Sequence, residues 1–222
     1  MAGQQIPIPE MCERFRKVYT GAITDVLDEM GIYHRTLPHT LQPLVPGTKV
    51  AGVAFPLYGV PNSKIDYQTS IRKVLTMLGE APKDSILVYQ TNDSVSAHLG
   101  ELSVTSLKVR GCRGAVIDGG VRDVEFILRE GFPVFARYKT PTDCVPRWEL
   151  LERNCSIIIG DVRIAPGDVI VADHDGIVAV PKEVAVEVLL KGEEVVNTEN
   201  QVREAVRGGM MPLEAYEQYG RF

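Results

Sequence analysis

Apolar residues recur every three or four positions in several stretches of the chain, which is the spacing of an amphipathic helix. Proline near the beginning of a stretch and glycine just after it mark where such a helix begins and ends. The pattern predicts helices within residues 9–31 (two short ones), 63–82, 97–110, 123–130 and 182–207.

Runs rich in β-branched residues lie between these helices and predict strands. The order strand, short helix, strand at 115–137 predicts two parallel strands joined by a right-handed crossover. Because the sequence shows no internal repeat or linker, we expect one α/β domain over residues 1–222, with N-terminal helices, mixed sheet layers and a long C-terminal helix. The strand segments are "LQPLVPGTKVAGVAFPLYGVP" at 41–61, "SILVYQ" at 85–90, "AVID" at 115–118, "VFAR" at 134–137 and "IIIGDVRIAPGDVIVADHDGIVAVP" at 157–181.

The composition is that of an ordinary globular protein, with 45 % hydrophobic and 24 % charged residues among 222. A net charge of −5, without any run of Lys and Arg, argues against a nucleic-acid partner, although a small anion could bind locally. The N-terminus lacks the apolar core of a signal peptide, and no window approaches 18 consecutive apolar residues. We therefore expect a cytoplasmic protein that does not associate with a membrane.

Several well-known kinds of site are absent from the sequence. The cysteines are spaced too irregularly for a zinc motif, so we expect free, buried thiols at Cys12, Cys112, Cys144 and Cys155. The four histidines do not have the spacing of zinc ligands, and no phosphate-binding loop, dinucleotide fingerprint or hydrolase motif occurs. The candidate chemistry therefore depends on carboxylates, an arginine and backbone amides.

Arg122 and Asp123 follow directly on an apolar run and a Gly-Gly pair in "AVIDGGVRD". This order places them at the carboxyl end of a predicted strand, where α/β sheets usually bind ligands. Two structural explanations compete with a site. Asp123 could cap the helix that follows, and Arg122 could pair with Asp118 or Asp123.

A second candidate lies in "SAHLGELSV", where Gly100 and Glu101 fall in or near the first turn of a helix. The unpaired N–H groups of a first turn can bind a carboxylate or phosphate, and glycine lets a ligand approach the backbone closely. The alternative is a glutamate that only complements the helix dipole.

Glu199 is the third candidate, because it lies on the apolar stripe of the predicted C-terminal helix. Val195, Val202 and Val206 lie within about 40° of it around the helix, whereas Glu204 is on the opposite side. A carboxylate on such a stripe needs a partner or a hydrated pocket. A structural ion pair or a partly exposed edge would satisfy this requirement equally well.

Three segments together resemble one family: "LVPGTKVAGVAF", "LGELSVTSLKVRGCRGAVIDGGVRDVEFILREGFPVFAR", and "PGDVIVADHDGIVAVP" followed by a helix. They are similar to the RraA-like proteins, which include the 4-hydroxy-4-methyl-2-oxoglutarate / 4-carboxy-4-hydroxy-2-oxoadipate aldolases and the regulator of ribonuclease E activity A. The resemblance covers about 10–207. Its most specific element is an acidic residue, twenty intervening residues and Arg-Asp, which corresponds to Glu101, Arg122 and Asp123. It implies a swivelling β/β/α-like fold.

The resemblance implies a divalent-metal-dependent pyruvate aldolase that cleaves a 4-hydroxy-2-oxo acid such as 4-hydroxy-4-methyl-2-oxoglutarate. Decarboxylation of oxaloacetate would be a side activity, because loss of CO₂ gives the same enolate. By this resemblance Asp123 holds the metal, Mg²⁺ or Mn²⁺. The substrate would be bound by Gly100, Glu101, Leu102, Ser103 and Arg122.

The same resemblance implies a homotrimer or homohexamer with sites at the subunit interfaces. Glu199 would come from the C-terminal helix of a neighbouring subunit and help to position water at the metal, so the candidate catalytic residues are Arg122, Glu101 and Glu199. This chain has Leu99 where many relatives have Trp, and a Ser-, Asn- and Asp-containing loop where they have a Gly-rich one. These departures leave the exact substrate open.

Two other functions remain open at this stage. One is a non-catalytic regulator that binds a ribonuclease by contact, a role that does not require Arg122 and Asp123. The other is a related metal-dependent lyase that acts on a different hydroxy acid or sugar acid. Retention of Glu101, Arg122 and Asp123 favours an enzyme.

Overall fold

Strand β3 (Ser85–Gln90) shows how the central sheet is covered on both faces. In the computed structural model, which describes residues 6–222, all of β3 except its last residue is buried. Ile86 and Val88 pack into one apolar cluster, and Leu87 and Tyr89 pack into another. A strand buried on both faces needs a continuous apolar run, which is why "SILVYQ" has no polar alternation.

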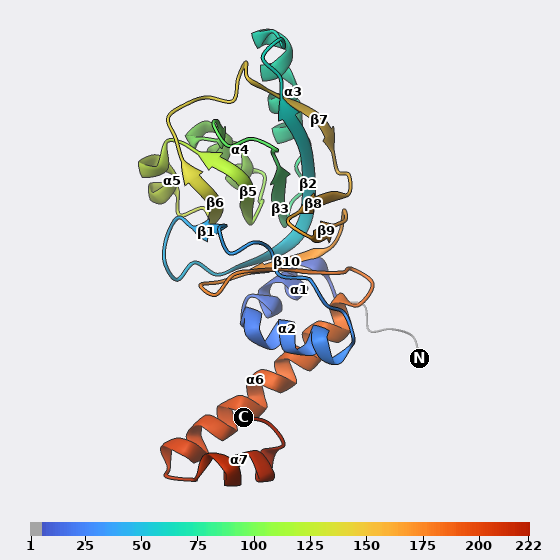
Figure 1. Cartoon of the computed structure of the whole chain (residues 1–222), viewed down its shortest axis with the longest axis vertical. Coiled ribbons are helices and arrows are strands. Elements are labelled where there is room, and N and C mark those ends of the chain that lie inside the picture. Colours follow the sequence, from blue (N-terminus) through green and yellow to red (C-terminus); the bar gives the residue numbers. More distant parts are fainter. Residues whose placement is uncertain (1–5) are drawn as a thin grey trace.

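The strands of the described residues form one nine-stranded mixed sheet and a separate hairpin (Figure 1). The bounds are β1 (Gln42–Pro43), β2 (Val50–Pro61), β4 (Ala97–Leu99), β5 (Gly114–Val121), β6 (Val134–Lys139), β7 (Trp148–Arg153), β8 (Ile157–Ile159), β9 (Val162–Ile164), β10 (Val169–Ala172) and β11 (Ile177–Val180). The order is β1-β6-β5-β3-β2-β10-β11, with β4 beside β5 and β7 beside β2. β2, β3, β5 and β6 run parallel, and the β8–β9 hairpin lies apart.

Helices cover the sheet in two groups, which Figure 1 shows above and below β10. The first group packs against β3 and β5 and consists of α3 (Tyr67–Glu80), α4 (Glu101–Val109) and α5 (Val124–Glu130). The second group packs against β10 and β11 and consists of α1 (Ile8–Phe15), α2 (Thr20–Glu29) and the first half of α6 (Ala185–Arg207). The β8–β9 hairpin covers a third apolar cluster on the remaining face.

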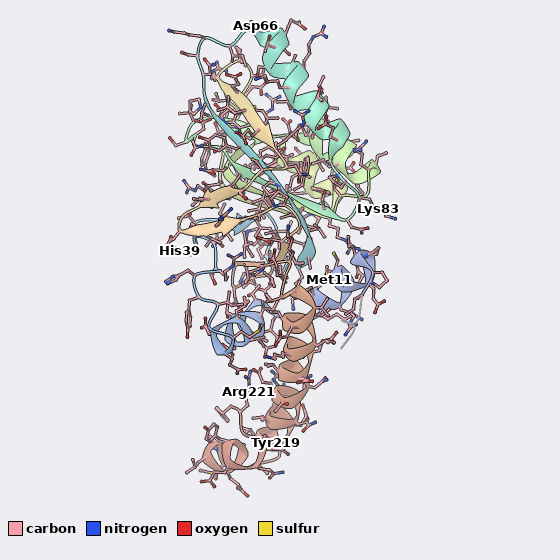
Figure 2. The ribbon with its side chains drawn as sticks, turned by 90° about the vertical axis from the view of Figure 1, so that its right-hand side faces the viewer. Met11, His39, Asp66, Lys83, Tyr219 and Arg221 are labelled. Carbon is pink, nitrogen blue, oxygen red and sulfur yellow. The ribbon has the colours of Figure 1, made fainter. Side chains whose placement is uncertain are left out.

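The second half of α6 projects away from this body and carries α7 (Pro212–Tyr219) at its tip. Figure 2 shows Asp66 at one end of the molecule and Tyr219 at the other. Arg14 of α1 anchors the first half of α6 by donating to Glu193 at 2.7 and 2.6 Å. After α7 the chain turns back, and Arg221 pairs with Glu29 of α2.

The projection exposes several large apolar side chains to solvent. These are Met211, Leu213, Tyr216 and Phe222, each more than half exposed. A cluster of this kind at the tip of a projecting element is typical of a surface that contacts another protein. Within residues 6–222, no helix combines the length and the hydrophobicity needed to cross a membrane.

The structure confirms the predicted α/β class, the two short N-terminal helices, the parallel strand–helix–strand unit and the long C-terminal helix. The predicted helix at 97–110 is wrong in its first turn. Ala97 and Leu99 pair with β5 as strand β4, so the helix begins only at Glu101. The four cysteines are free as predicted, with three buried and Cys155 half-buried.

A buried aspartate joins the turn after β10 to the start of α2. Asp173 is 6 % exposed and accepts hydrogen bonds from the backbone N–H of Thr20 at 2.8 Å and from its hydroxyl at 2.7 Å. Thr20 is the first residue of α2, so its N–H has no partner inside the helix. Asp173 therefore caps a helix that is distant from it in the sequence.

We expect Asp173→Ala to lower the free energy of unfolding by about 2–3 kcal/mol, because it leaves the N–H of Thr20 buried without a charged acceptor. Urea unfolding followed by far-UV circular dichroism measures this loss. Asp175→Ala is the matched control in the same turn, since Asp175 is exposed, and should change stability by less than about 0.5 kcal/mol. Equal stability of the two variants would show that Asp173 does not cap α2.

Candidate functional site

The Gly-Gly pair before Arg122 makes room for strand β4. A Cβ atom added to Gly120 would lie 2.6 Å from the carbonyl oxygen of Ser96 and 2.4 Å from the ring of Tyr138. Any larger residue would separate β4 from β5. The glycines thus bring the chain around residues 97–101 against the carboxyl end of β5, where Arg122 and Asp123 lie.

Asp123 has a left-handed backbone conformation, with φ at +56°, which aspartate tolerates better than most residues. It occupies the N-cap position of α5, but its side chain does not cap that helix. Oδ2 instead accepts the backbone N–H of Glu101 at 3.2 Å. The alternative explanation, that Asp123 caps the following helix, holds for its backbone position but not for its side chain, because the carboxylate turns toward α4.

Gly100 permits this contact. A Cβ atom at position 100 would lie 2.6 Å from Oδ2 of Asp123 and 3.4 Å from Nε of Arg122. Only a residue without a side chain lets the two segments approach so closely. Gly100 therefore makes room for the carboxylate of Asp123, and its predicted role in the close approach of a ligand stays a prediction.

Arg122 lies between two carboxylates. Its Nε is 3.6 Å from Oδ2 of Asp123, and its NH2 is 3.5 Å from Oδ2 of Asp143. The suggested pairing with Asp118 is wrong, because Asp118 pairs with Arg137 at 2.5 Å. Both distances from Arg122 exceed a normal hydrogen bond, so its guanidinium can bind a further anion.

The first turn of α4 supplies backbone donors beside this arginine. Glu101 gives its N–H to Asp123, and its carboxylate accepts the hydroxyl of Thr105 at 3.2 Å. The N–H groups of Leu102 and Ser103 are the next two in the turn and have no acceptor within an α-helix. They form the kind of N-terminal position that binds carboxylates.

A cavity of about 310 Å³ joins most of the predicted site residues. Gly100, Leu102, Ser103, Arg122 and Asp123 all line it. Asp143 lines the same cavity and was not predicted. Its sequence neighbourhood, the loop "TPTDCVP", carries no signal that it returns to Arg122.

Glu199 does not line this cavity, because it lies on the half of α6 that projects away from the body of the protein (Figure 1). Glu199 is half-buried and lines a separate hollow with Val202, Val206, Arg203 and Phe222. The predicted apolar stripe is confirmed, because Val195 and Val202 are buried and Val206 is half-buried, whereas Glu204 is exposed. A role for Glu199 beside Arg122 would require a second copy of the chain, and it stays a prediction.

His98 lies directly beneath the loop that carries Gly100. The imidazole is buried, its Nε2 lies 3.1 Å from Oδ2 of Asp93, and its ring meets that of Trp148 edge-on at 4.8 Å. Burial lowers the pKa of His98 to about 4, although Asp93 acts in the opposite direction. The imidazole is therefore neutral at pH 7, and it lines the same cavity as Arg122 and Asp123.

The fold and the cavity together define a class of protein: a mixed α/β sheet with a cavity at the carboxyl ends of its parallel strands, the place where α/β sheets usually bind ligands. The sequence matches the RraA-like family, described as Aldolase/RraA, over residues 20–179. The chain belongs to this family.

Two relatives extend over most of the chain. DlpA of Legionella pneumophila is 28 % identical over 213 residues, which make up 96 % of this chain and 34 % of DlpA. The chain thus spans about a third of that protein's length. A Halalkalibacterium halodurans protein, provisionally named 4-hydroxy-4-methyl-2-oxoglutarate aldolase, is 28 % identical over 203 residues and 91 % of each chain.

Two crystal structures share the fold. One, described among novel cellulases from gut-associated microbes, is 35 % identical, with a TM-score of 0.83 over 90 % of this chain and 91 % of that one. The other is RraAS2 of Streptomyces coelicolor, described as an unusual member of the RNase ES inhibitor RraA protein family. It is 27 % identical, with a TM-score of 0.78 over 92 % of this chain and all of that one.

The buried His98 makes the stability of the protein depend on pH. A folded-state pKa of about 4, below the ordinary value of about 6.5, means that the unfolded chain takes up the proton first as the pH falls. Stability is complete above about pH 6.5 and falls toward pH 4, with an upper bound of about 3 kcal/mol for the complete loss. Urea unfolding from about pH 7 to about pH 5 measures this slope.

His98→Phe keeps an aromatic ring against Trp148 and should flatten the slope. His39→Gln, at an exposed histidine, should retain the slope of the unchanged protein. If His98→Phe retains it as well, the neutral buried imidazole is not its source.

Proposed function

We propose that this protein is a divalent-metal-dependent carbon–carbon lyase that cleaves a 4-hydroxy-2-oxo acid to pyruvate. The observation that carries the proposal is the shared cavity of Arg122, Asp123 and the first turn of α4. Within one cavity, a cation and unpaired backbone donors can bind the carboxylate and oxo oxygens of a 2-oxo acid, and a carboxylate can hold the metal ion that such an acid would contact. The aldolase name of the Halalkalibacterium halodurans relative agrees with this chemistry.

The donor set around Asp123 fits Mg²⁺ or Mn²⁺ better than zinc. Among residues 6–222 no group of three or more His, Cys, Asp or Glu side chains comes together. The carboxylate of Asp123 is 42 % exposed at the cavity and can hold one position of a hydrated ion. Mg²⁺ keeps several water ligands, whereas a zinc site usually takes three or four protein ligands, and no such group comes together among residues 6–222.

Arg122 and the first turn of α4 would orient the substrate. The guanidinium pairs with the carboxylate or 2-oxo group, and the N–H groups of Leu102 and Ser103 donate to the same end of the molecule. When bound at Asp123, the metal ion would supply positive charge for the 2-oxo oxygen as it becomes an enolate. Arg122 stabilises the same developing charge from the other side.

Cleavage also needs a base for the C4 hydroxyl. The base takes the proton of this hydroxyl, C4 becomes the carbonyl carbon of the second product, and the electron pair of the C3–C4 bond moves to C3. Protonation of C3 then gives pyruvate. Glu101 is the candidate base within the chain, acting directly or through water, and its carboxylate is held by Thr105. Glu199 of a neighbouring subunit is the second candidate. Loss of CO₂ from oxaloacetate gives the same enolate, so we expect that side activity.

We expect pyruvate release from 4-hydroxy-2-oxo acids and from oxaloacetate to require Mg²⁺ or Mn²⁺. Asp123→Ala should reduce kcat by 10³-fold or more in a folded protein, and Arg122→Lys by about 10²- to 10³-fold, because lysine lacks the planar fork. Pyruvate is measured with the EDTA-stripped protein by coupling to lactate dehydrogenase, with and without added metal.

The controls are Glu125→Ala and Arg129→Lys, two exposed positions of α5 that pair with each other. Both should retain the activity of the unchanged protein. Normal metal-dependent turnover by Asp123→Ala would overturn the proposed role of its carboxylate, and no pyruvate from any substrate by the unchanged protein would overturn the lyase.

We propose in addition that the active form is a homotrimer or homohexamer, in which Glu199 of one subunit completes the site of the next. Glu199→Gln and Arg122→Lys should each be nearly inactive alone. Subunits of the two variants coexpressed in equal amounts should recover about a quarter of full activity, because about one site in four then combines two intact residues. Activity of mixed oligomers no higher than that of the single variants would contradict this arrangement.

A second candidate function is a protein-binding regulator of a ribonuclease. The relation to RraAS2 and the exposed apolar side chains on α7 favour it. Such a role does not need Arg122 or Asp123. Ribonuclease inhibition that survives Asp123→Ala, by a protein that releases no pyruvate, would select this function over the lyase.

A further inference from the structure

The cavity that holds Arg122 and Asp123 continues as an apolar groove between α3 and α4. One end carries the polar groups described above. The other end is a wall of aliphatic side chains with no charged group among them: Ile71, Val74, Leu75, Leu78, Leu102 and Val145. The lining of the cavity thus combines polar groups around Arg122 and Asp123 with an apolar part contributed by α3 and α4.

The apolar wall follows from the sequence of α3. Ile71, Val74, Leu75 and Leu78 recur with the period of a helix, so they form one stripe. Met77, beside this stripe, is buried in the core, whereas Leu75 is 57 % exposed. Across the groove Leu102 is 79 % exposed in the first turn of α4. Apolar side chains that a single chain leaves exposed beside a polar site favour a ligand with an apolar part.

The charges at the polar end argue against a second carboxylate on the rest of the substrate. Arg122 is the one cationic side chain among the described residues that line this cavity, and it already faces Asp123 and Asp143. A second carboxylate on the substrate would meet Asp143 or the aliphatic wall, where, among residues 6–222, no cationic side chain other than Arg122 lines the cavity. Placing a carboxylate in such surroundings is costly, whereas a carbon chain gains by leaving water.

A hollow on the opposite side of Arg122 offers the other direction for a substrate. It has a volume of about 430 Å³ and is lined by Val121, Val124, Lys139, Thr140 and Pro141 together with Arg122 and Asp123. Lys139 is exposed, so its ammonium group keeps most of its hydration, and an ion pair there contributes little. The groove between α3 and α4 is therefore the better place for the rest of the substrate.

We propose, on the basis of the lyase function above, that the substrate is a 4-hydroxy-2-oxo monocarboxylic acid with an alkyl or aryl group on C4 that lies between α3 and α4. Cleavage of the C3–C4 bond then gives pyruvate and an apolar aldehyde or ketone. The proton of the C4 hydroxyl goes to the base, the electron pair of the bond goes to C3, and C3 takes up a proton.

The test compares kcat/KM for pyruvate release, with Mg²⁺ present, across 4-hydroxy-2-oxo acids with a methyl, propyl, pentyl or phenyl group on C4. We expect kcat/KM to rise about three- to fourfold for each methylene that enters the groove. 4-Hydroxy-4-methyl-2-oxoglutarate, which carries a second carboxylate, should be a poorer substrate than the pentyl compound by 10-fold or more.

Leu75→Asp should abolish the gain with chain length, so that kcat/KM for the pentyl compound no longer exceeds that for the methyl compound. Thr76→Asp is the matched control, since Thr76 is an exposed neighbour on α3 that does not line the groove, and it should retain the gain. Because Leu75 is itself largely exposed, its replacement should not prevent folding.

The outcomes separate this inference from the lyase function. Pyruvate release that is flat with chain length, or a gain that persists in Leu75→Asp, overturns the apolar substrate and leaves the lyase intact. A preference for 4-hydroxy-4-methyl-2-oxoglutarate that disappears in Lys139→Ala does the same and assigns the opposite hollow. No pyruvate from any of the compounds overturns the lyase itself.

Discussion

The hydrogen bond from the N–H of Glu101 to the carboxylate of Asp123 determines the arrangement of the whole site. It joins the end of β5 to the start of α4, two segments separated by 21 intervening residues. The bond can form only because Gly100 has no Cβ atom and Gly120 lets β4 lie against β5. The carboxylate thus satisfies one donor of the first turn of α4, while the following donors remain available for a ligand.

This arrangement gives the site its balance of charge. Asp123 and Asp143 lie on either side of Arg122 at more than hydrogen-bond distance, so they hold the guanidinium in place without neutralising it completely. In the proposed lyase, a substrate carboxylate would bring a negative charge and the metal ion a double positive charge to this group, and each would favour binding of the other. The imidazole of His98, two residues before Gly100, is neutral at pH 7 and therefore adds no charge to the site.

The sequence predicted most of the elements because their periods are local. Prediction from the sequence failed where a contact between residues distant in the chain determines the secondary structure or the direction of a side chain. Leu99 and Leu102 have helical spacing, yet pairing with Val121 makes Leu99 part of a strand. Asp123 precedes a helix in the chain, so local pattern assigned it to that helix, whereas the tertiary structure turns it to another. Asp143 was missed altogether, since nothing in the sequence of its loop indicates that it returns to Arg122.

Contacts between chains could in the same way determine the role of Glu199, which in a single chain lies apart from the other candidate site residues. The second half of α6, which carries Glu199, and the following α7 expose apolar side chains to water, which is unfavourable. Arg221 pairs with Glu29 and so fixes the C-terminal turn against α2. In the proposed oligomer, a second copy that covered these side chains would bring a further carboxylate to the site, where the carboxylate of Glu101 already accepts the hydroxyl of Thr105. Assembly and completion of the site would then be one event, and the free energy of burying α7 would hold Glu199 in place.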